Sequence, residues 1–205
     1  MTHAGARPAT TPVPASAAAR RARVTGGVAL LLGAVLVGCG SDSRSAAEPE
    51  DGGGRLEAGG VSAVCPDGWM VLADDKLPEN NDAAAVLRED GEITGKVVIQ
   101  LDFMRASDTE LAAIGAAGSY VFGGRTKSRK DIEVEGTDSA KRLDYEPRES
   151  TGRDRVPPRG TVVNGTDVVG MDARDKPFLV RIITERGAVP KADVDRLVSS
   201  VAVRG

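Results

Sequence analysis

The sequence predicts a single α+β domain, built from an antiparallel β-sheet flanked by helices and preceded by an export signal and a flexible tether. Residues 96–104 alternate apolar and polar side chains, as a strand with one buried face does. Residues 107–124 form an alanine-rich run that ends at two glycines, as a helix does. Residues 161–172 and 177–184 are β-rich runs joined by a polar stretch of turn length, which indicates a hairpin.

The first 38 residues have the pattern of a signal peptide. Arg20, Arg21 and Arg23 precede an uncharged apolar run over 24–37, which is shorter than the ~20 residues that a membrane-spanning helix needs. The adjacent arginines also occur in twin-arginine signals, so both general secretory export and twin-arginine export stay open.

The signal ends at Leu36-Val37-Gly38-Cys39, which resembles the lipobox of bacterial lipoproteins. In those proteins a small residue precedes a cysteine that is acylated and becomes the new N-terminus. The resemblance implies that Cys39 is the lipidation site and that the lipid holds the protein at the extracytoplasmic face of the cell membrane. The alternative is an ordinary secretory signal followed by a chance cysteine.

Removal of residues 1–38 limits the chemistry of the mature chain. His3, the only histidine, leaves with the signal, which excludes Ser-His-Asp and Cys-His catalysis and histidine-containing zinc sites. Four of 27 basic residues are also lost, so 23 remain against 30 acidic ones and the net charge is about −7. A nucleic-acid partner is therefore not expected. Acylation of Cys39 would leave Cys65 without an intrachain disulfide partner.

Residues 39–60 are predicted to be the lipidated N-terminus and a disordered linker. The segment is rich in Gly, Ser, Ala, Glu and Pro, and it has a single leucine, so it cannot bury enough apolar surface to become ordered. A coil of this composition would span roughly 25 Å. The folded domain is predicted over 61–205, a length sufficient for one hydrophobic core.

In the first half of this domain we expect two short strands, then a longer strand and a helix. Val61 to Cys65 is a strand candidate, Pro66-Asp67-Gly68 has the residues of a tight turn, and the strand resumes over 69–72. After the strand at 96–104, Ser107 and Glu110 have the spacing of a capping box.

The apolar side of the predicted helix is expected to be Leu111, Ile114 and Val121. The many alanines of the same helix would let it lie close to a sheet.

In the second half we expect two alternating strands, a hairpin and a final helix. The two strands centre on Ile132 with Val134 and on Leu143 with Tyr145. Within the hairpin, Asn164-Gly165 is either a bulge or a second tight turn. The final helix begins near Pro190, and its apolar residues have helical spacing: Val194, Leu197, Val198 and Val201.

Three segments carry a resemblance to a known fold: Cys65-Pro66-Asp67-Gly68-Trp69, the strand at 178–184 and the closing helix at 190–203. With the strands between them, residues 61–203 resemble the PsbP-like group of α/β/α folds, and in particular the LpqN-type lipoproteins of actinobacteria. The resemblance implies an antiparallel sheet between helices and a binding role in the envelope. It transfers no catalytic residue. The loop at 147–160 is an elaboration on the pattern.

Several local features have a functional and a structural interpretation. Trp69 lines a ligand pocket or, as we favour, anchors the core. The acidic stretch 74–82 supplies oxygen ligands that calcium prefers, but it lacks the glycine and closing glutamate of an EF-hand and is favoured as a solvated loop. The basic run 125–130 either contacts anionic lipid headgroups or complements the dipole at a helix C-terminus.

Two further features are a loop and a thiol. The arginines of the 147–160 loop are a candidate partner contact (Arg148, Arg153, Arg155 and Arg159). Cys65 is expected to be a small buried residue. No catalytic, cofactor-binding or metal-binding residue is assigned.

The sequence thus favours a non-enzymatic lipoprotein domain that binds another envelope component. Two other classes stay open. A carrier of a small apolar ligand would contain an apolar cavity of several hundred Å³. A histidine-free hydrolase would use paired carboxylates, or Ser128 or Ser139 with a neighbouring lysine as base.

Overall fold

A computed structural model of the chain describes residues 53–119, 125–152 and 157–205. The strands are β1 (Gly53–Ala58), β2 (Val61–Asp67), β3 (Trp69–Val71), β4 (Ala83–Glu89), β5 (Glu92–Leu101), β6 (Thr126–Ile132), β7 (Ala140–Tyr145), β8 (Arg148–Glu149), β9 (Val162–Met171), β10 (Pro177–Glu185) and β11 (Ala202–Val203). The helices are α1 (Thr109–Ser119), α2 (Lys191–Ser199) and the 3₁₀ turn η1 (Asp74–Lys76).

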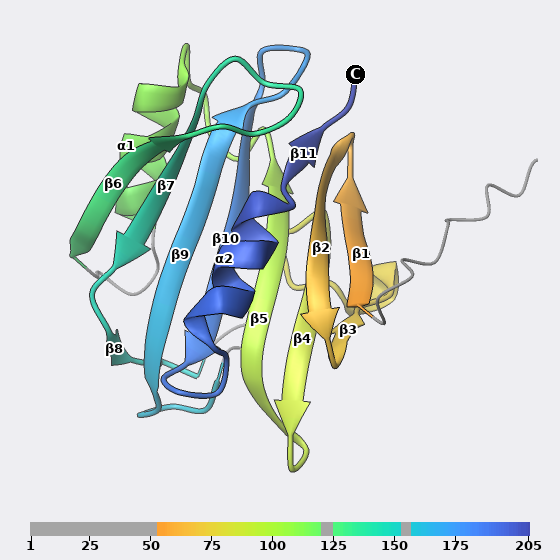
Figure 1. The fold of residues 1–205 in the computed structure, drawn as a ribbon, viewed down its shortest axis with the longest axis vertical. Coiled ribbons are helices and arrows are strands. Elements are labelled where there is room, and N and C mark those ends of the chain that lie inside the picture. The colour runs from red at the N-terminus through yellow and green to blue at the C-terminus, as the bar shows by residue number, and fades with distance from the viewer. Residues whose placement is uncertain (1–52, 120–124, 153–156) are drawn as a thin grey trace, which may run out of the picture. The chain divides into compact units, whose positions relative to one another are not determined.

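These strands form two antiparallel sheets, so the predicted α+β class is confirmed (Figure 1). The large sheet has the order β3-β4-β5-β10-β9-β7-β6, with β8 beside β9, and the small sheet has the order β1-β2-β11. Within this order, β3-β4-β5, β9-β10 and β6-β7 are consecutive along the chain. The pairs β5-β10 and β7-β9 join strands that are farther apart in the sequence. None of the helices in the described part of the chain has the length and apolar content to cross a membrane.

Both faces of the large sheet are covered, and the central strand β10 shows why. Its consecutive side chains point to opposite faces, and eight of its nine residues are buried. Phe178 packs in the main core with α2 and the small sheet, whereas Leu179 packs with the alanines of α1. The large sheet is therefore the middle layer between α1 on one face and α2 with the small sheet on the other.

The start of the folded region differs from the prediction. Residues 53–60 were assigned to the linker, but Gly53–Ala58 forms β1 and pairs with β2. Leu56, the single leucine of that segment, is fully buried. One apolar residue gives no periodic signal, so its pairing with β2 could not be anticipated. The signal peptide at 1–38, Cys39 and the rest of the linker up to residue 52 lie outside the described residues.

The elements that follow agree with the prediction at β2 and β3, and differ at β4. Gly68 has φ +83° in the turn between β2 and β3, as the predicted turn requires. β4 was not predicted because Ala83-Ala84-Ala85-Val86 is apolar throughout, and a strand buried on both faces shows no alternation. β5 ends at Leu101, before the predicted end at 104.

Helix α1 forms where the sequence predicts it, but its cap and its buried face are different. Asp108 is the capping side chain, since its Oδ1 accepts the Leu111 N–H at 2.8 Å. Leu111 and Ile114 are 42% and 54% exposed, so they are not the packing face. The helix packs instead through its three fully buried alanines, Ala112, Ala113 and Ala116. Val121 lies outside the described residues.

In the second half β7, β9, β10 and α2 confirm the predicted elements. β6 ends at Ile132, and Val134 is buried just beyond it. Asn164 and Gly165 are neither a bulge nor a turn, because they pair with Thr184 and Ile183 in an unbroken register between β9 and β10. α2 starts directly after Pro190 and ends at Ser199, and the chain then adds β11 to the small sheet.

Candidate functional site

A groove with a volume of about 660 Å³ lies on the α2 face of the large sheet. We call it the α2 groove. It is lined by Lys127, Ser128, Lys130, Ile132, Arg142, Asp144, Tyr145, Pro147, Asn164, Gly165, Thr166, Ile182, Thr184, Val189, Lys191 and Val194. A volume of this size is within the range of ligand-binding clefts.

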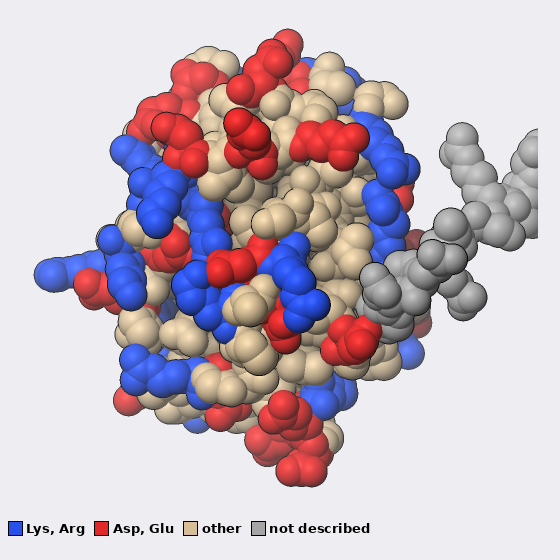
Figure 2. All heavy atoms as spheres, viewed as in Figure 1, with Lys and Arg blue, Asp and Glu red and all other residues tan. Residues whose placement is uncertain are grey.

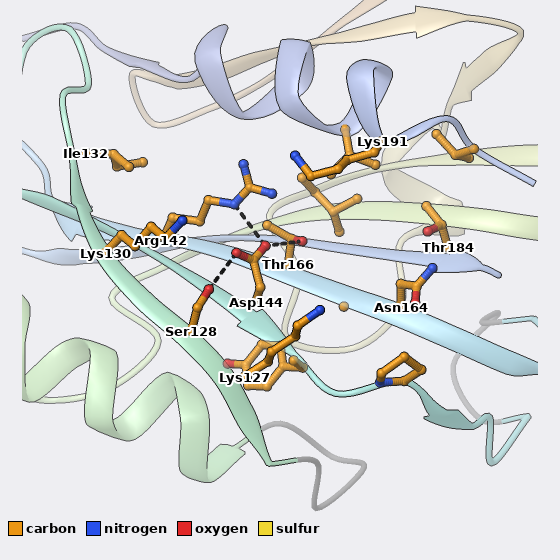
Figure 3. Close-up of a pocket in the computed structure, with 16 residues that line it drawn as sticks. Lys127, Ser128, Lys130, Ile132, Arg142, Asp144, Asn164, Thr166, Thr184 and Lys191 are labelled. Carbon is orange, nitrogen blue, oxygen red and sulfur yellow. Dashed lines mark hydrogen bonds and ion pairs between the residues drawn. The ribbon is translucent and has the colours of Figure 1, made fainter. Parts of the chain in front are cut away.

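Three parts of the fold build the groove (Figure 3). β6 and β7 form one side, which carries most of its charge. β9 and β10 form the floor, where Asn164, Thr166 and Thr184 present amide and hydroxyl groups. α2 and Val189, which lies two residues before its start, form the other side, where Val189 and Val194 are apolar. One side of the groove is therefore charged, the floor is polar and the other side is largely apolar.

A network centred on Asp144 holds the charged side together. Asp144 Oδ1 accepts from Arg142 Nε at 2.9 Å and from the Thr166 hydroxyl at 3.0 Å, and Asp144 Oδ2 accepts from the Ser128 hydroxyl at 2.9 Å. The carboxylate is thus bound by three donors from β6, β7 and β9. Among the residues that the structure describes, it is the only carboxylate that lines the α2 groove.

Arg142 also ties the sheet to α2. Its Nη1 donates to Asp195 Oδ1 at 2.7 Å, and Asp195 Oδ2 accepts from Lys191 Nζ one turn earlier on the helix. Arg142 is only 16% exposed, so this contact is partly shielded from water. Two acids, Asp144 and Asp195, therefore neutralise two of the four groove cations, Arg142 and Lys191.

The ionisation of both acids follows from these contacts. Burial acts to raise the pKa of Asp144, but the hydrogen bonds from Arg142 and Ser128 outweigh it and hold the pKa below the ordinary value. Hydrogen bonds from Lys191 and Arg142 likewise lower the pKa of Asp195. Both carboxylates are ionised at neutral pH.

Asp144→Asn is expected to lower the free energy of unfolding by about 1–3 kcal/mol at pH 7, because Arg142 loses a charged partner. A carboxylate whose folded pKa is lowered stabilises the protein above its unfolded pKa of about 3.9, and that contribution is lost as the pH falls further, towards the lowered folded value. The difference from wild type should therefore shrink between about pH 4 and pH 2. Urea denaturation followed by fluorescence of Trp69, the only tryptophan, measures it.

Asp75→Asn is the matched control, because Asp75 is exposed in η1. It should change stability by less than about 0.5 kcal/mol. If the free energy of unfolding of Asp144→Asn stays below that of wild type by a constant amount down to pH 2, the assigned role of the carboxylate is contradicted.

The basic run 125–130 was predicted at a helix C-terminus, and the structure corrects this. Most of the run lies on β6, an edge strand of the large sheet in the described part of the chain. Its charges are divided between two faces. Arg129 pairs with Glu110 of α1 at 2.7 Å, whereas Lys127 and Lys130 line the α2 groove. Figure 2 shows Lys and Arg side chains gathered over β6 and β7 and beside α2.

The place of Lys127 depends on a local irregularity in β6. In a regular strand, Lys127 and Ser128 would point to opposite faces. Here the register of β6 against β7 shifts between Thr126 and Ser128, and both Lys127 and Ser128 line the groove. Such β-bulges redirect side chains and are frequent beside functional sites. In Figure 3 the Lys127 side chain points into the cavity.

The other sequence candidates lie away from the groove. Trp69 is 8% exposed in the main core, which confirms the core interpretation. In the acidic stretch, Asp82 accepts the Leu101 N–H at 2.8 Å, so this carboxylate fastens the loop to β5. No group of three or more acidic, histidine or cysteine side chains that would suit a metal ion occurs among the described residues. Of the loop arginines, 153 and 155 lie outside those residues.

Cys65 and the two serines have structural partners or surroundings. Cys65 is fully buried, and burial raises the pKa of its thiol to about 12. Ser128 donates to Asp144, and the Ser139 hydroxyl lies 2.6 Å from the Thr109 hydroxyl. Each of these serine hydroxyls is therefore hydrogen-bonded to a partner other than the lysine base that a serine–lysine mechanism would need.

The basic run singled out in the sequence contains Lys127 and Lys130 of the groove. Lys191 and the residues that hold the groove together, Arg142 and Asp144, were not singled out as site residues. Their alternation with Leu143 indicates that Arg142 and Asp144 lie on the face of the sheet opposite Leu143. No local pattern indicates that α2 packs on that face.

Comparison with known proteins gives structural neighbours only. A scan against protein-family models finds no match, and a search of curated proteins finds none either. Similar solved structures include cyanobacterial PsbP (CyanoP) from Synechocystis, with 17% identity, a TM-score of 0.45 and coverage of 82% of this chain and 99% of that one. PsbP is the fold named by the sequence resemblance.

Two further neighbours come from other organisms. The Ran-binding protein Mog1p of Saccharomyces cerevisiae has 14% identity, a TM-score of 0.42 and coverage of 74% of this chain and 95% of that one. A protein from Bacteroides thetaiotaomicron has 11% identity and a TM-score of 0.43 over 71% of this chain. This chain spans 46% of the length of the Bacteroides protein.

Proposed function

We propose that this chain is a lipid-anchored protein of the cell envelope whose α+β domain binds another envelope component through the α2 groove. Lipidation at Cys39 would place the domain outside the cytoplasm, with residues 40–52 between the lipid and β1. The proposal describes a binding protein without catalysis. Its anchor is supported by the lipobox resemblance, and its binding role by the groove.

The observation that carries the binding role is the unbalanced charge of the groove. Four cations line it, and the two nearby acids are engaged with Arg142 and Lys191. Lys127 and Lys130 have no ion-pair partner among the described residues, and both are exposed. An acidic protein that keeps two uncompensated cations in a groove of this size is suited to bind a negatively charged partner.

The alternatives find less support in this geometry. A carrier of an apolar ligand needs a cavity with a mainly apolar lining, and the α2 groove has charged and polar side chains on one side and on its floor. A carboxylate-based hydrolase needs two carboxyl groups facing one cleft. Asp144 is the one carboxylate lining this groove, and three hydrogen-bond donors occupy it.

Crosslinking in intact cells tests the proposal with three forms of the protein. We expect wild type to recover one envelope protein or complex. Cys39→Ala should leave the membrane fraction and lose that partner, because the anchor is gone. Lys127→Glu with Lys130→Glu should stay in the membrane fraction and still lose the partner, because the groove has changed charge.

A matched control separates groove chemistry from net charge. Lys76→Glu with Arg204→Glu makes the same change of charge at exposed positions outside the groove, and it should recover the partner as wild type does. Metabolic labelling with a palmitate analogue should mark wild type and not Cys39→Ala. An unlabelled wild type would overturn the anchor, and a partner retained by the groove variant would overturn the binding role of the groove.

A further inference from the structure

We infer that the occupant of the α2 groove is an acidic, extended segment of a protein partner, whose carboxylates bind Lys127 and Lys130. The inference rests on the proposed function and names the chemistry that its site would recognise. It follows from the charge of the groove at β6, the polar groups of its floor and the apolar residues at α2.

The uncompensated positive charge of the groove is concentrated on its β6 side. Arg142 and Lys191 are neutralised by Asp144 and Asp195, so they offer little net charge to a ligand. Lys127 and Lys130 remain, both on β6 and both pointing to the groove side. Two ammonium groups on one strand, without a competing acid, suit a ligand that carries two carboxylates close together.

The bulge in β6 is what brings these two lysines together. Positions 127 and 130 differ by an odd number, so in a regular strand their side chains would lie on opposite faces of the sheet. The register shift between Thr126 and Ser128 places Lys127 on the same groove as Lys130. The local backbone is thus arranged so that both charges face the cavity.

The floor of the groove distinguishes a peptide from a lipid. Asn164 and Thr166 lie two residues apart on β9, and Thr184 of β10 lies opposite Asn164, so the floor supplies hydrogen-bond donors and acceptors on both strands. A peptide backbone has amide groups for such partners, whereas an acyl chain would leave them unsatisfied. The hydroxyl of Thr166 already donates to Asp144, so its remaining capacity is as an acceptor of a peptide N–H.

The α2 side of the groove accommodates an apolar side chain. Val189 and Val194 line the groove there and pack against the main core cluster, which includes Ile182 of the floor. A free phosphate or a single headgroup would leave most of a groove of about 660 Å³ unfilled. The best-matched ligand has two adjacent acidic residues followed by alternating apolar and small polar residues.

Fluorescence anisotropy with a defined peptide tests the inference. The probe is a fluorescein-labelled peptide with the sequence Glu-Glu-Val-Thr-Val-Thr, and its neutral counterpart begins Gln-Gln. With the exported Cys39→Ala chain, the acidic peptide should bind at least about tenfold more tightly than the neutral one. Raising NaCl from about 0.05 M to about 0.5 M should weaken the binding, because the contact is electrostatic.

The variants separate the two lysines from general charge. Lys127→Gln with Lys130→Gln should lower the affinity for the acidic peptide about tenfold and leave the affinity for the neutral peptide unchanged. Lys76→Gln with Arg204→Gln removes the same charge outside the groove and should bind as the parent does. Circular dichroism of each variant checks that its fold is retained.

Three outcomes would overturn the inference. One is equal affinity for the acidic and neutral peptides, and another is an affinity that the lysine variant does not change. The third is lysine-dependent binding to phosphatidylglycerol vesicles with no binding to the peptide, which would identify a lipid site. If groove-dependent crosslinks persist in cells while the peptide fails to bind, the proposed function stands and this inference alone is wrong.

Discussion

Replacing Arg181 by methionine is expected to lower the free energy of unfolding by about 3–5 kcal/mol, because it leaves a buried carboxylate without its cation. Asp167 is fully buried and the Arg181 side chain is 9% exposed. The guanidinium binds the carboxylate through two hydrogen bonds, Nε to Oδ1 at 2.9 Å and Nη2 to Oδ2 at 2.7 Å. Urea denaturation followed by Trp69 fluorescence gives the value.

The size of the effect follows from the number of elements that this pair joins. Arg181 Nη2 also donates to the Ala116 carbonyl of α1 at 2.9 Å, and the Tyr145 hydroxyl of β7 donates to Asp167 Oδ2 at 2.7 Å. β7, β9, β10 and α1 thus meet at one ion pair. With the arginine gone, the Tyr145 hydroxyl remains on the carboxylate, but both hydrogen bonds from the guanidinium are lost.

A double replacement distinguishes a missing cation from a simple loss of volume. Asp167→Leu together with Arg181→Met removes both charges and should recover much of the lost stability, because buried ion pairs are often replaceable by apolar residues. The coupling energy between the two positions should therefore exceed about 1 kcal/mol. A cost below about 1 kcal/mol for Arg181→Met alone would show that the pair does not stabilise the fold.

The sequence contained a signal for this pair that pattern reading did not use. Asp167 is the one charged residue of β9, and Arg181 is the one charged residue among the eight buried residues of β10. Once the turn at 173–176 is placed, antiparallel pairing sets these two residues opposite each other, as the register confirms. Residues of opposite charge inside two buried strands of one hairpin therefore predict a cross-strand ion pair.

Elements defined by local pattern were predicted well, and contacts that depend on tertiary packing were not. β7 and α2 each had the period of their structure, and the hairpin had two β-rich runs on either side of a polar turn. The face of α1 was wrong because Leu111 and Ile114 suggested burial by size, whereas the small alanines allow the close approach to the sheet. β1 was missed because Leu56 acquires its burial only through pairing with β2.

The candidate site was predictable only in part, for the same reason. The run at 125–130 indicated a basic surface, but its placement on β6 and the register shift at Lys127 come from pairing with β7. The α2 groove also forms only because α2 packs beside β7, where Asp195 binds Arg142. These two residues are 53 positions apart in the chain, so no local pattern predicts their contact.

The main core offers the second large effect, at Phe178. This side chain is fully buried and is the largest of the fully buried side chains. Phe178→Ala is expected to cost about 3–5 kcal/mol, through lost burial and the cavity left behind. Chemical denaturation measures the cost, and Phe178→Leu, which keeps most of the volume, should cost clearly less.

Gly170, the residue opposite Phe178 on β9, provides a sharper test of the same packing. A Cβ added at Gly170 would lie 2.7 and 2.8 Å from two ring atoms of Phe178, closer than real Cβ contacts. Gly170→Ala alone should therefore destabilise the protein by about 1–3 kcal/mol. In the Phe178→Ala background the ring is absent, so the cost of the same methyl group should fall, and what remains is its approach to the Ser139 carbonyl oxygen at 3.2 Å. If Gly170→Ala costs the same in both backgrounds, contact with the ring does not explain why glycine is needed at this position.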